Sequence, residues 1–198
     1  MDMYTFSNEA NTVKGIPVND SESSLGICET RWTGSGEFNS DSFKVLYSGE
    51  VYAPTTASSE EEIDEFYNTL EKAKTQCKST DVTVIMGDLN AKVGNEAEGE
   101  TVGKFGLGTQ NERGEKWVQW CKTNEYVLTN TWYEQHPRRL WTWLNPGSDF
   151  KNQIDYIAIK KRYRSAIKNS KAYPGADCGS DHNPFICELK IKNGNKIN

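Results

Sequence analysis

The sequence has no long apolar segment and few features of an exported chain. No stretch approaches the ~20 consecutive apolar residues of a membrane-spanning helix, and residues 1–19 lack the apolar core of a signal peptide. The five cysteines are odd in number and form no Cys-x-x-Cys pair, so neither a disulfide framework nor a zinc site is expected. These absences predict an intracellular chain in a reducing compartment, without a membrane partner.

Several catalytic motifs are also missing. The glycine-rich run Gly103–Gly108 lacks the spacing of a phosphate-binding Walker A loop. No Gly-x-Ser-x-Gly turn of a serine hydrolase occurs. The chain has two histidines, and neither lies near Cys28 or Cys121 in the sequence, so a cysteine nucleophile has no support.

What the chain does contain suits one folded domain. Its 198 residues are enough to bury a sizeable core. Aromatic residues make up 11% of the chain, which argues against disorder as a whole. We expect a polar, poorly ordered leader over residues 1–24, a domain over 25–191 and a polar tail over 192–198.

The net charge of −5 hides a strong asymmetry between the two halves. Residues 1–100 carry 7 Lys and Arg against 19 Asp and Glu, whereas residues 101–198 carry 16 against 9. A basic half is typical of a surface that meets a polyanion, although two solvated faces of one domain would look the same.

Apolar periodicity predicts an α/β fold. Helical spacing of apolar residues indicates helices over 59–78 and about 112–123, the first with a capping box at Ser59 and Glu62. A turn is expected at 34–36. A central strand is expected over Val82–Met86. Further strands are expected at 25–28, 43–47, 51–54, 126–130, 140–144, 153–159 and 184–191.

Asp88 and Asn90 directly follow the strand predicted at 82–86. Side chains two residues apart at a strand end point the same way, so a carboxylate and an amide could converge there. Ligands in open α/β sheets bind at such carboxyl ends. The alternative is a turn in which the Asp side chain hydrogen-bonds its own backbone.

Three other acidic or basic residues suggest chemistry of the same kind. Glu29 follows the strand at 25–28 and could bind a metal ion or pair with Arg31. Asp155 lies on an alternating strand, and a carboxylate buried there needs a partner. We expect that partner to be His182, which lies in a turn before an apolar strand, because an Asp–His pair supports acid–base or phosphate-binding roles. His136, by contrast, is expected on the surface.

Residues 151–171 form the most basic segment, with seven Lys and Arg and one acid. Tryptophans precede it at positions 141 and 143. Bases interleaved with aromatic rings suit a nucleic-acid surface, and a solvated basic face is the alternative. The candidate nucleic-acid contacts are Arg31, Arg138, Arg139, Trp143, Lys160, Lys161 and Arg162.

Taken together and in order, these segments resemble the endonuclease/exonuclease/phosphatase superfamily. The motifs that carry the resemblance are Cys28-Glu29-Thr30-Arg31, Val51-Tyr52-Ala53-Pro54, Gly87-Asp88-Leu89-Asn90, Gln153-Ile154-Asp155-Tyr156 and Gly179-Ser180-Asp181-His182. The finer likeness, at 29–36, 90–94, 103–108 and 175–182, is to the endonuclease domains of RTE-type non-LTR retrotransposons.

The resemblance implies a four-layer α/β sandwich, with two mixed sheets face to face and helices outside. It implies that Glu29 and Asp181 hold Mg²⁺, or Mn²⁺ in its place. It further implies that Asp88 orients or deprotonates the attacking water and that Asn90 positions the nucleophile. His182, oriented by Asp155, would contact the scissile phosphate or act as a base. Tyr52 would stabilise charge near the leaving group.

The chain departs from the superfamily pattern in two places. No strand ending in Trp-Asn is recognisable in residues 1–24, and Ser48-Gly49-Glu50 replaces an internal block of strands. The resulting expectation is a Mg²⁺-dependent endonuclease that nicks DNA, located in the nucleus. The alternatives are an inactive nucleic-acid-binding remnant and a phosphatase or phosphodiesterase of the same superfamily. The sequence indicates no protein partner.

Overall fold

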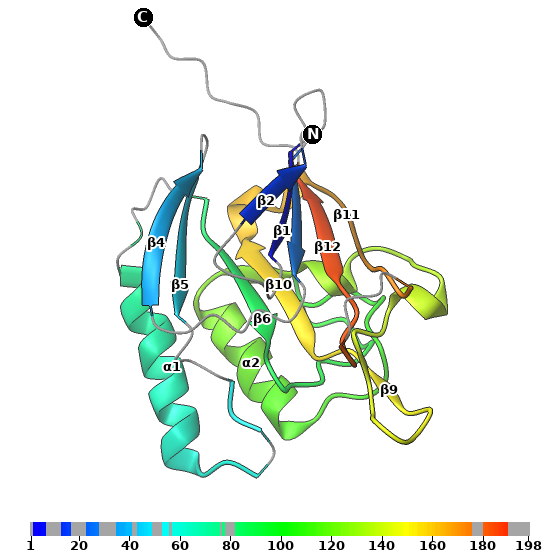
Figure 1. Cartoon of the computed structure of the whole chain (residues 1–198). Coiled ribbons are helices and arrows are strands. Elements are labelled where there is room, and N and C mark those ends of the chain that lie inside the picture. The colour runs from blue at the N-terminus through cyan, green and yellow to red at the C-terminus, as the bar shows by residue number, and fades with distance from the viewer. Residues whose placement is uncertain are drawn as a thin grey trace, which may run out of the picture.

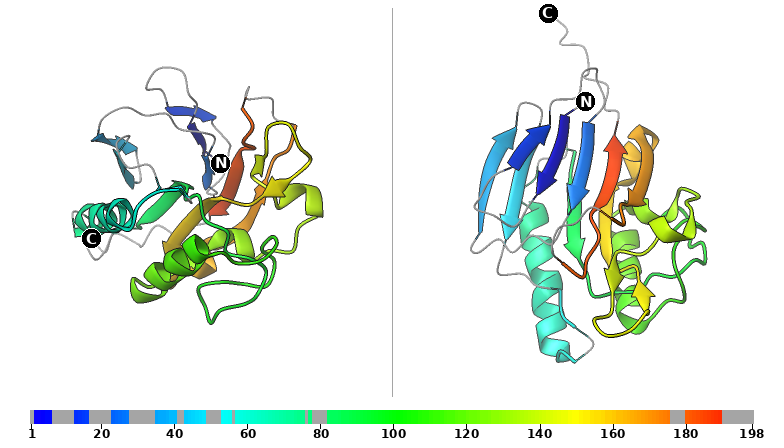
Figure 2. Two further views of the ribbon diagram at one scale, coloured as in Figure 1. Left: turned by 90° about the horizontal axis from the view of Figure 1, so that it is seen from below. Right: turned by 45° about the vertical axis from the view of Figure 1, so that its right-hand side comes forward.

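The fold was analysed in a computed structural model of the chain, which describes residues 2–6, 13–16, 23–27, 35–40, 43–48, 53–55, 57–75, 77, 82–175 and 180–189. Two β-sheets lie face to face, and two α-helices flank one of them (Figures 1 and 2). The predicted α/β class and the pair of facing sheets are therefore confirmed. None of the helices in this described part combines the length and apolarity needed to span a bilayer.

The larger sheet has five strands in the order β11-β12-β3-β1-β2. β1 and β3 are parallel and the other neighbours are antiparallel, so the sheet is mixed. Its strands are β1 (Asp2–Phe6), β2 (Val13–Ile16), β3 (Ser23–Ile27), β11 (Ile167–Ala172) and β12 (Phe185–Leu189).

The smaller sheet has three antiparallel strands in the order β6-β10-β7. These are β6 (Val84–Asp88), β10 (Asp155–Lys160) and β7 (Tyr126–Leu128). Among the described strands, β10 and not β6 is the central one of this sheet, so the expectation of a central strand at 82–86 is not met there. β6 is half-buried throughout.

Two apolar cores lie on the two faces of the smaller sheet. Helices α1 (Glu60–Thr75) and α2 (Glu112–Thr123) pack on one face, where Trp117 and Tyr156 are fully buried. The five-stranded sheet packs on the other face, where Ile157 and Phe185 are fully buried. Because successive side chains of a strand point to opposite faces, β10 contributes to both cores.

Short elements complete the described part of the chain. Two-stranded sheets are formed by β4 (Ser35–Ser40) with β5 (Phe43–Ser48) and by β8 (Trp143–Leu144) with β9 (Lys151–Asn152). Three 3₁₀-helices follow β7, precede β8 and follow β10, namely η1 (Thr129–Thr131), η2 (Pro137–Arg139) and η3 (Lys161–Ala166).

Local sequence signals located both helices well. α2 has the predicted bounds, and α1 begins at the predicted capping box, in which Ser59 N–H donates to Glu62 Oε2 (2.8 Å) and Glu62 N–H to Ser59 Oγ (3.3 Å). The strands near 25, 43, 126, 153 and 184 are also found.

Other sequence expectations need correction. Residues 2–6 and 13–16 form β1 and β2 where no strand was expected. β1 pairs with β3 and β2 pairs with β1, so the two strands extend the five-stranded sheet. Ser35 and Gly36 begin β4 instead of forming a turn. The strand at 140–144 shortens to two residues, and β11 was not predicted. Residues 53–55 form no strand, and Val51 and Tyr52 lie outside the described residues.

Candidate active site

Two carboxylates are brought together by strand pairing at one end of the smaller sheet. β6 ends at Asp88 and the antiparallel strand β10 begins at Asp155, and these two residues are direct cross-strand partners. Opposed positions in an antiparallel pair place Cβ atoms about 5 Å apart. Asp155 is 3% exposed, so its charge needs a polar partner close by.

His182 supplies that partner. Its Nδ1 lies 2.9 Å from Asp155 Oδ2 and 3.2 Å from Oδ1, and its Nε2 lies 4.0 Å from Asp88 Oδ2. The imidazole therefore lies between the two carboxylates. The Asp155–His182 pair that the sequence predicted is confirmed.

The proximity of these groups shifts their pKa values. Burial, together with the charge of Asp155, raises the pKa of Asp88 to about 6. Burial alone would lower the pKa of His182, but the hydrogen bond and charge of Asp155, helped by Asp88 and Asp181, outweigh it and raise the pKa to about 9. At neutral pH the imidazole of His182 is therefore protonated, and the carboxyl group of Asp88 titrates about one pH unit below neutrality.

Asn90 forms a tight turn behind Asp88. Its N–H donates to Asp88 Oδ1 (2.8 Å), and its backbone has φ = 48°, a left-handed conformation that asparagine tolerates. Its side-chain Nδ2 donates to the carbonyl of Ala53 (3.0 Å). The turn weighed as the alternative for this motif is therefore present, and it leaves Asp88 Oδ2 directed toward His182.

Two buried polar residues that the sequence analysis missed hold the start of β10. Asn130 donates through Nδ2 to the carbonyl of Asp155 (2.8 Å) and accepts the N–H of Ile157 (3.1 Å). Thr142 Oγ1 accepts the N–H groups of Ile154 (3.0 Å) and Asp155 (3.1 Å). Asn130 is 1% exposed and Thr142 is fully buried. The sequence offered one indication of them, namely that each is a polar residue in an otherwise apolar segment expected to form a strand.

Thr142 also reaches the histidine segment. Its carbonyl accepts the N–H of Asn183 (2.7 Å), the residue after His182. One residue thus contacts both backbone segments that carry the Asp–His pair.

The loop after Asn90 is held by helix α2. Asn111 caps the helix, with its Oδ1 accepting the N–H of Gly114 (2.8 Å) and that of Lys92 (2.9 Å). A Cβ at Gly114 would lie 1.8 Å from the Lys92 carbonyl, so only glycine allows this approach. The turn that contains Asp88 and Asn90 is therefore attached to a rigid element.

Asp181 lies at the exposed rim of the cluster. Its Oδ2 accepts the indole N–H of Trp143 (2.7 Å), and its carbonyl accepts the N–H of Leu144. Trp143, which the sequence suggested as a nucleic-acid contact, thus orients a carboxylate.

Three of the sequence-predicted site residues cannot be placed. Glu29, Arg31 and Tyr52 lie outside the described residues. Among the residues that are described, no three His, Cys, Asp or Glu side chains are arranged to hold a metal ion. Asp88 and Asp181 are carboxylates, the oxygen ligands that Mg²⁺ prefers, so the described donors suit the ion in kind but not in number.

The predicted nucleic-acid contacts divide into two groups. Arg139 lies over the ring of Tyr173 (5.4 Å), and Tyr173 N–H donates to the carbonyl of Pro184, two residues after His182. Arg138 is exposed beside it on η2. Lys160, Lys161 and Arg162 instead lie at the far end of β10. His136 is exposed as expected, and its Nδ1 accepts the N–H of Arg138.

The comparisons with known proteins concern the family and the fold. Residues 46–186 match the endonuclease-reverse transcriptase family. The chain belongs to this family. Its fold is also that of the endonuclease domain of TRAS1, a telomere-specific non-LTR retrotransposon, with a TM-score of 0.53 over 79% of this chain and 63% of that one, at 11% identity.

Two curated relatives are similar over most of the chain. Craniofacial development protein 2 from Bos taurus is 36% identical over 214 residues, which cover 85% of this chain and 36% of the relative. The protein of the same name from Tragulus javanicus is 35% identical, with 85% and 37% covered. The chain thus spans little more than a third of the length of these relatives.

Proposed function

We propose that this chain hydrolyses phosphodiester bonds in DNA as a metal-dependent endonuclease. The observation that supports this most directly is the placement of His182 between Asp155 and Asp88, at the edge where β6 ends and β10 begins. Positioned charge and a proton acceptor are what phosphodiester hydrolysis requires.

Each residue of the cluster has a chemical role in this proposal. Asp155 holds Nδ1 of His182, and the resulting imidazolium binds a non-bridging oxygen of the scissile phosphate. Asp88 accepts a proton from the attacking water while the water oxygen bonds to phosphorus, because a pKa of about 6 lets this carboxylate take a proton near neutral pH. The P–O bond to the leaving oxygen breaks in the same displacement, and that oxygen takes a proton from solvent. Asn90 fixes the backbone turn that holds Asp88. Tyr52 acts near the leaving oxygen, a role that rests on the resemblance alone.

A Mg²⁺ ion, with Mn²⁺ as a substitute, would be held by Asp181 and Glu29 in this proposal. The ion would neutralise charge that develops on the phosphate. β3 ends at Ile27, which pairs with Phe185 at the start of β12. Glu29 follows Ile27 by two residues, and His182 precedes Phe185 by three. Trp143 fixes one oxygen of Asp181.

DNA is the proposed substrate, which would place the protein in the nucleus. The proposal is supported by the matched endonuclease-reverse transcriptase family and by Arg139, which lies over Tyr173, a residue whose N–H donates to the carbonyl of Pro184 two residues after His182. A nucleic-acid-binding chain without activity is the second candidate. It is favoured by the small number of metal donors among the described residues.

A nicking assay on supercoiled plasmid tests the proposal. Activity should require Mg²⁺ or Mn²⁺ and stop in EDTA, and Asp88→Asn should lower it by about 10³-fold or more. Asp149→Asn is the matched control, because this carboxylate is exposed just before β9 and has no role in the proposed mechanism. Undiminished nicking in EDTA would disprove the metal role. Duplex binding without nicking under any condition would favour the second candidate.

A further inference from the structure

The far end of β10 carries a concentration of positive charge that the proposed catalytic cluster does not use. A cavity of about 440 Å³ is lined there by Lys74, Cys77, Thr83, Glu125, Lys160, Lys161 and Arg162. A second cavity, of about 600 Å³, shares Lys161 and Arg162 and adds Arg164 beside Trp132 and Glu100. Among the described residues, the two cavities together are lined by five bases and two acids.

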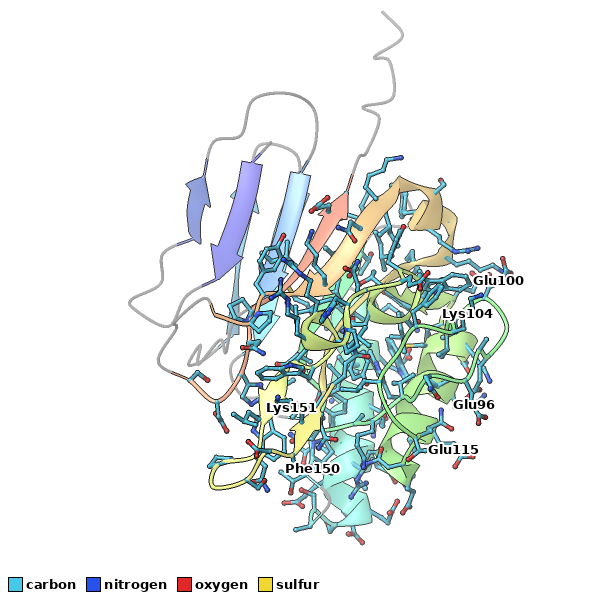
Figure 3. The ribbon with its side chains drawn as sticks, turned by 90° about the vertical axis from the view of Figure 1, so that its right-hand side faces the viewer. Glu96, Glu100, Lys104, Glu115, Phe150 and Lys151 are labelled. Carbon is cyan, nitrogen blue, oxygen red and sulfur yellow. The ribbon has the colours of Figure 1, made fainter. Side chains whose placement is uncertain are left out.

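This basic surface is well separated from the catalytic cluster. Asp155 begins β10 and Lys160 ends it, and five residues of extended strand span about 17 Å. Figure 3 shows Glu100 beside the 3₁₀-helix η3 at one end, and Phe150 and Lys151 near the hairpin of β8 and β9 at the other. A ligand bound at Lys160 therefore does not occupy the position between His182 and Asp88.

Two of these bases make their closest contacts with neutral groups, and the charges of Glu125 and Glu100 act on them from a greater distance. Lys160 Nζ donates to the carbonyl of Asn124 (2.7 Å) and lies over the ring of Tyr126 (4.4 Å). The Arg164 guanidinium lies 3.6 Å from the ring centroid of Trp132. Two others, Lys74 and Lys161, pair with Glu71 and Glu100.

The bases also act on one another. Burial and the charges of Lys74 and Arg162 lower the pKa of Lys160, and the charges of Glu125 and Glu71 offset only part of this effect. An anion bound among them would relieve this repulsion. Pre-positioned cations next to aromatic rings match the repeated phosphates of a nucleic-acid backbone better than a single small anion, since the cavities are open and adjacent.

We propose that the surface formed by Lys160, Arg162 and Arg164 binds the phosphodiester backbone of a second stretch of nucleic acid, separate from the one at the catalytic cluster. The inference rests on the proposed function in taking nucleic acid as the partner. It adds a binding site that does not take part in hydrolysis.

The test uses a labelled DNA duplex of about 10 base pairs in EDTA, so that binding is measured without cleavage. The far-end variant is Lys160→Gln/Arg162→Gln/Arg164→Gln. Its control, Lys72→Gln/Lys104→Gln/Lys168→Gln, removes the same charge from exposed bases that line neither cavity. Calorimetry gives the number of duplexes bound, and anisotropy gives the salt dependence.

The wild type and the control should bind two duplexes per chain, and the far-end variant one. The slope of log affinity against log salt at the lost site should account for about two to three phosphate contacts. One duplex per chain in all three proteins, or the same loss in the control, overturns the proposal. Because Lys160→Gln also removes the carbonyl and aromatic contacts of this side chain, Arg162→Gln/Arg164→Gln is measured beside the triple variant and should lose the same site. Because EDTA prevents cleavage, this result is independent of whether the chain nicks DNA.

Discussion

β10 begins with Asp155 beside a second carboxylate and a histidine, and it ends with Lys160 among other bases. At the first end His182 lies between Asp155 and Asp88, and the interaction of these groups shifts the pKa values of His182 and Asp88. At the second end, Lys160 and Arg164 contact a carbonyl and aromatic rings.

This difference separates two ways in which a fold uses charge. A cluster whose members bind each other sets protonation states, which suits chemistry. Cations held by neutral groups keep their charge for an external anion, which suits binding. The two ends should therefore respond differently to substitution.

The largest effect is expected from Asp155→Asn. The amide can still contact His182, but it no longer stabilises the imidazolium, so nicking should fall by about 10³- to 10⁴-fold. Initial rates on supercoiled plasmid measure the loss, and circular dichroism checks that the fold persists. A loss smaller than tenfold would mean that the pair is structural.

A large effect on stability is expected from Asn130→Ala at the same end of the strand. The substitution leaves the carbonyl of Asp155 and the N–H of Ile157 without their partner in a buried site. We expect a loss of about 3 kcal/mol and a melting temperature lower by roughly 6–12 °C. Thermal unfolding measures it. Asn169→Ala is the comparison, because Asn169 is half-buried on β11 away from the cluster.

A spectroscopic effect is expected at His182. Its imidazole resonances should titrate with a midpoint near pH 9, since Asp155 raises the pKa to about 9. In Asp155→Asn the midpoint should fall by more than about one pH unit, because the charge of Asp155 no longer opposes the lowering of the His182 pKa by burial. Proton–nitrogen NMR in EDTA follows this, and the resonances of the exposed His136 should be the same in the two proteins. Equal midpoints in both proteins would contradict the described pairing.

The smallest effect is expected from Lys160→Met at the far end. Nicking of plasmid at low salt should have an unchanged kcat, because the side chain is remote from the cluster. The lost carbonyl and aromatic contacts should cost about 1 kcal/mol or less, which lowers the melting temperature by roughly 2–4 °C. A tenfold lower kcat would remove the distinction between the two ends.

The sequence predicted the features that depend on local pattern. Helix α2 was located by apolar spacing, and the start of α1 by the Ser59–Glu62 capping box. The Asp155–His182 pair was predicted because a buried carboxylate needs a partner and the chain offers few. Each of these inferences needs only residues close in sequence, or the rule that a buried charge requires a polar partner.

The remaining features depend on contacts between distant segments. β11 reads Ile-Lys-Asn-Ser-Lys-Ala, and its buried positions include Ser170 and Ala172, so it lacks the apolar alternation of a typical strand. The role of Thr142 and Asn130 is seen only in the folded chain, where both hydrogen-bond to the backbone at the start of β10. The distance between Lys160 and Asp155 was not predicted either, because a count of bases over 151–171 does not show that these residues lie at opposite ends of one strand.

The alternation of β10 has a consequence for how the molecule unfolds. Tyr156 and Ala158 belong to the core beneath the helices, whereas Ile157 and Ile159 belong to the core between the sheets. Neither core can open at β10 without exposing the other, and a shift of one residue in pairing would exchange their occupants. We therefore expect the described domain to lose both cores in one cooperative transition, with hydrogen-exchange protection of β10 amides set by global unfolding.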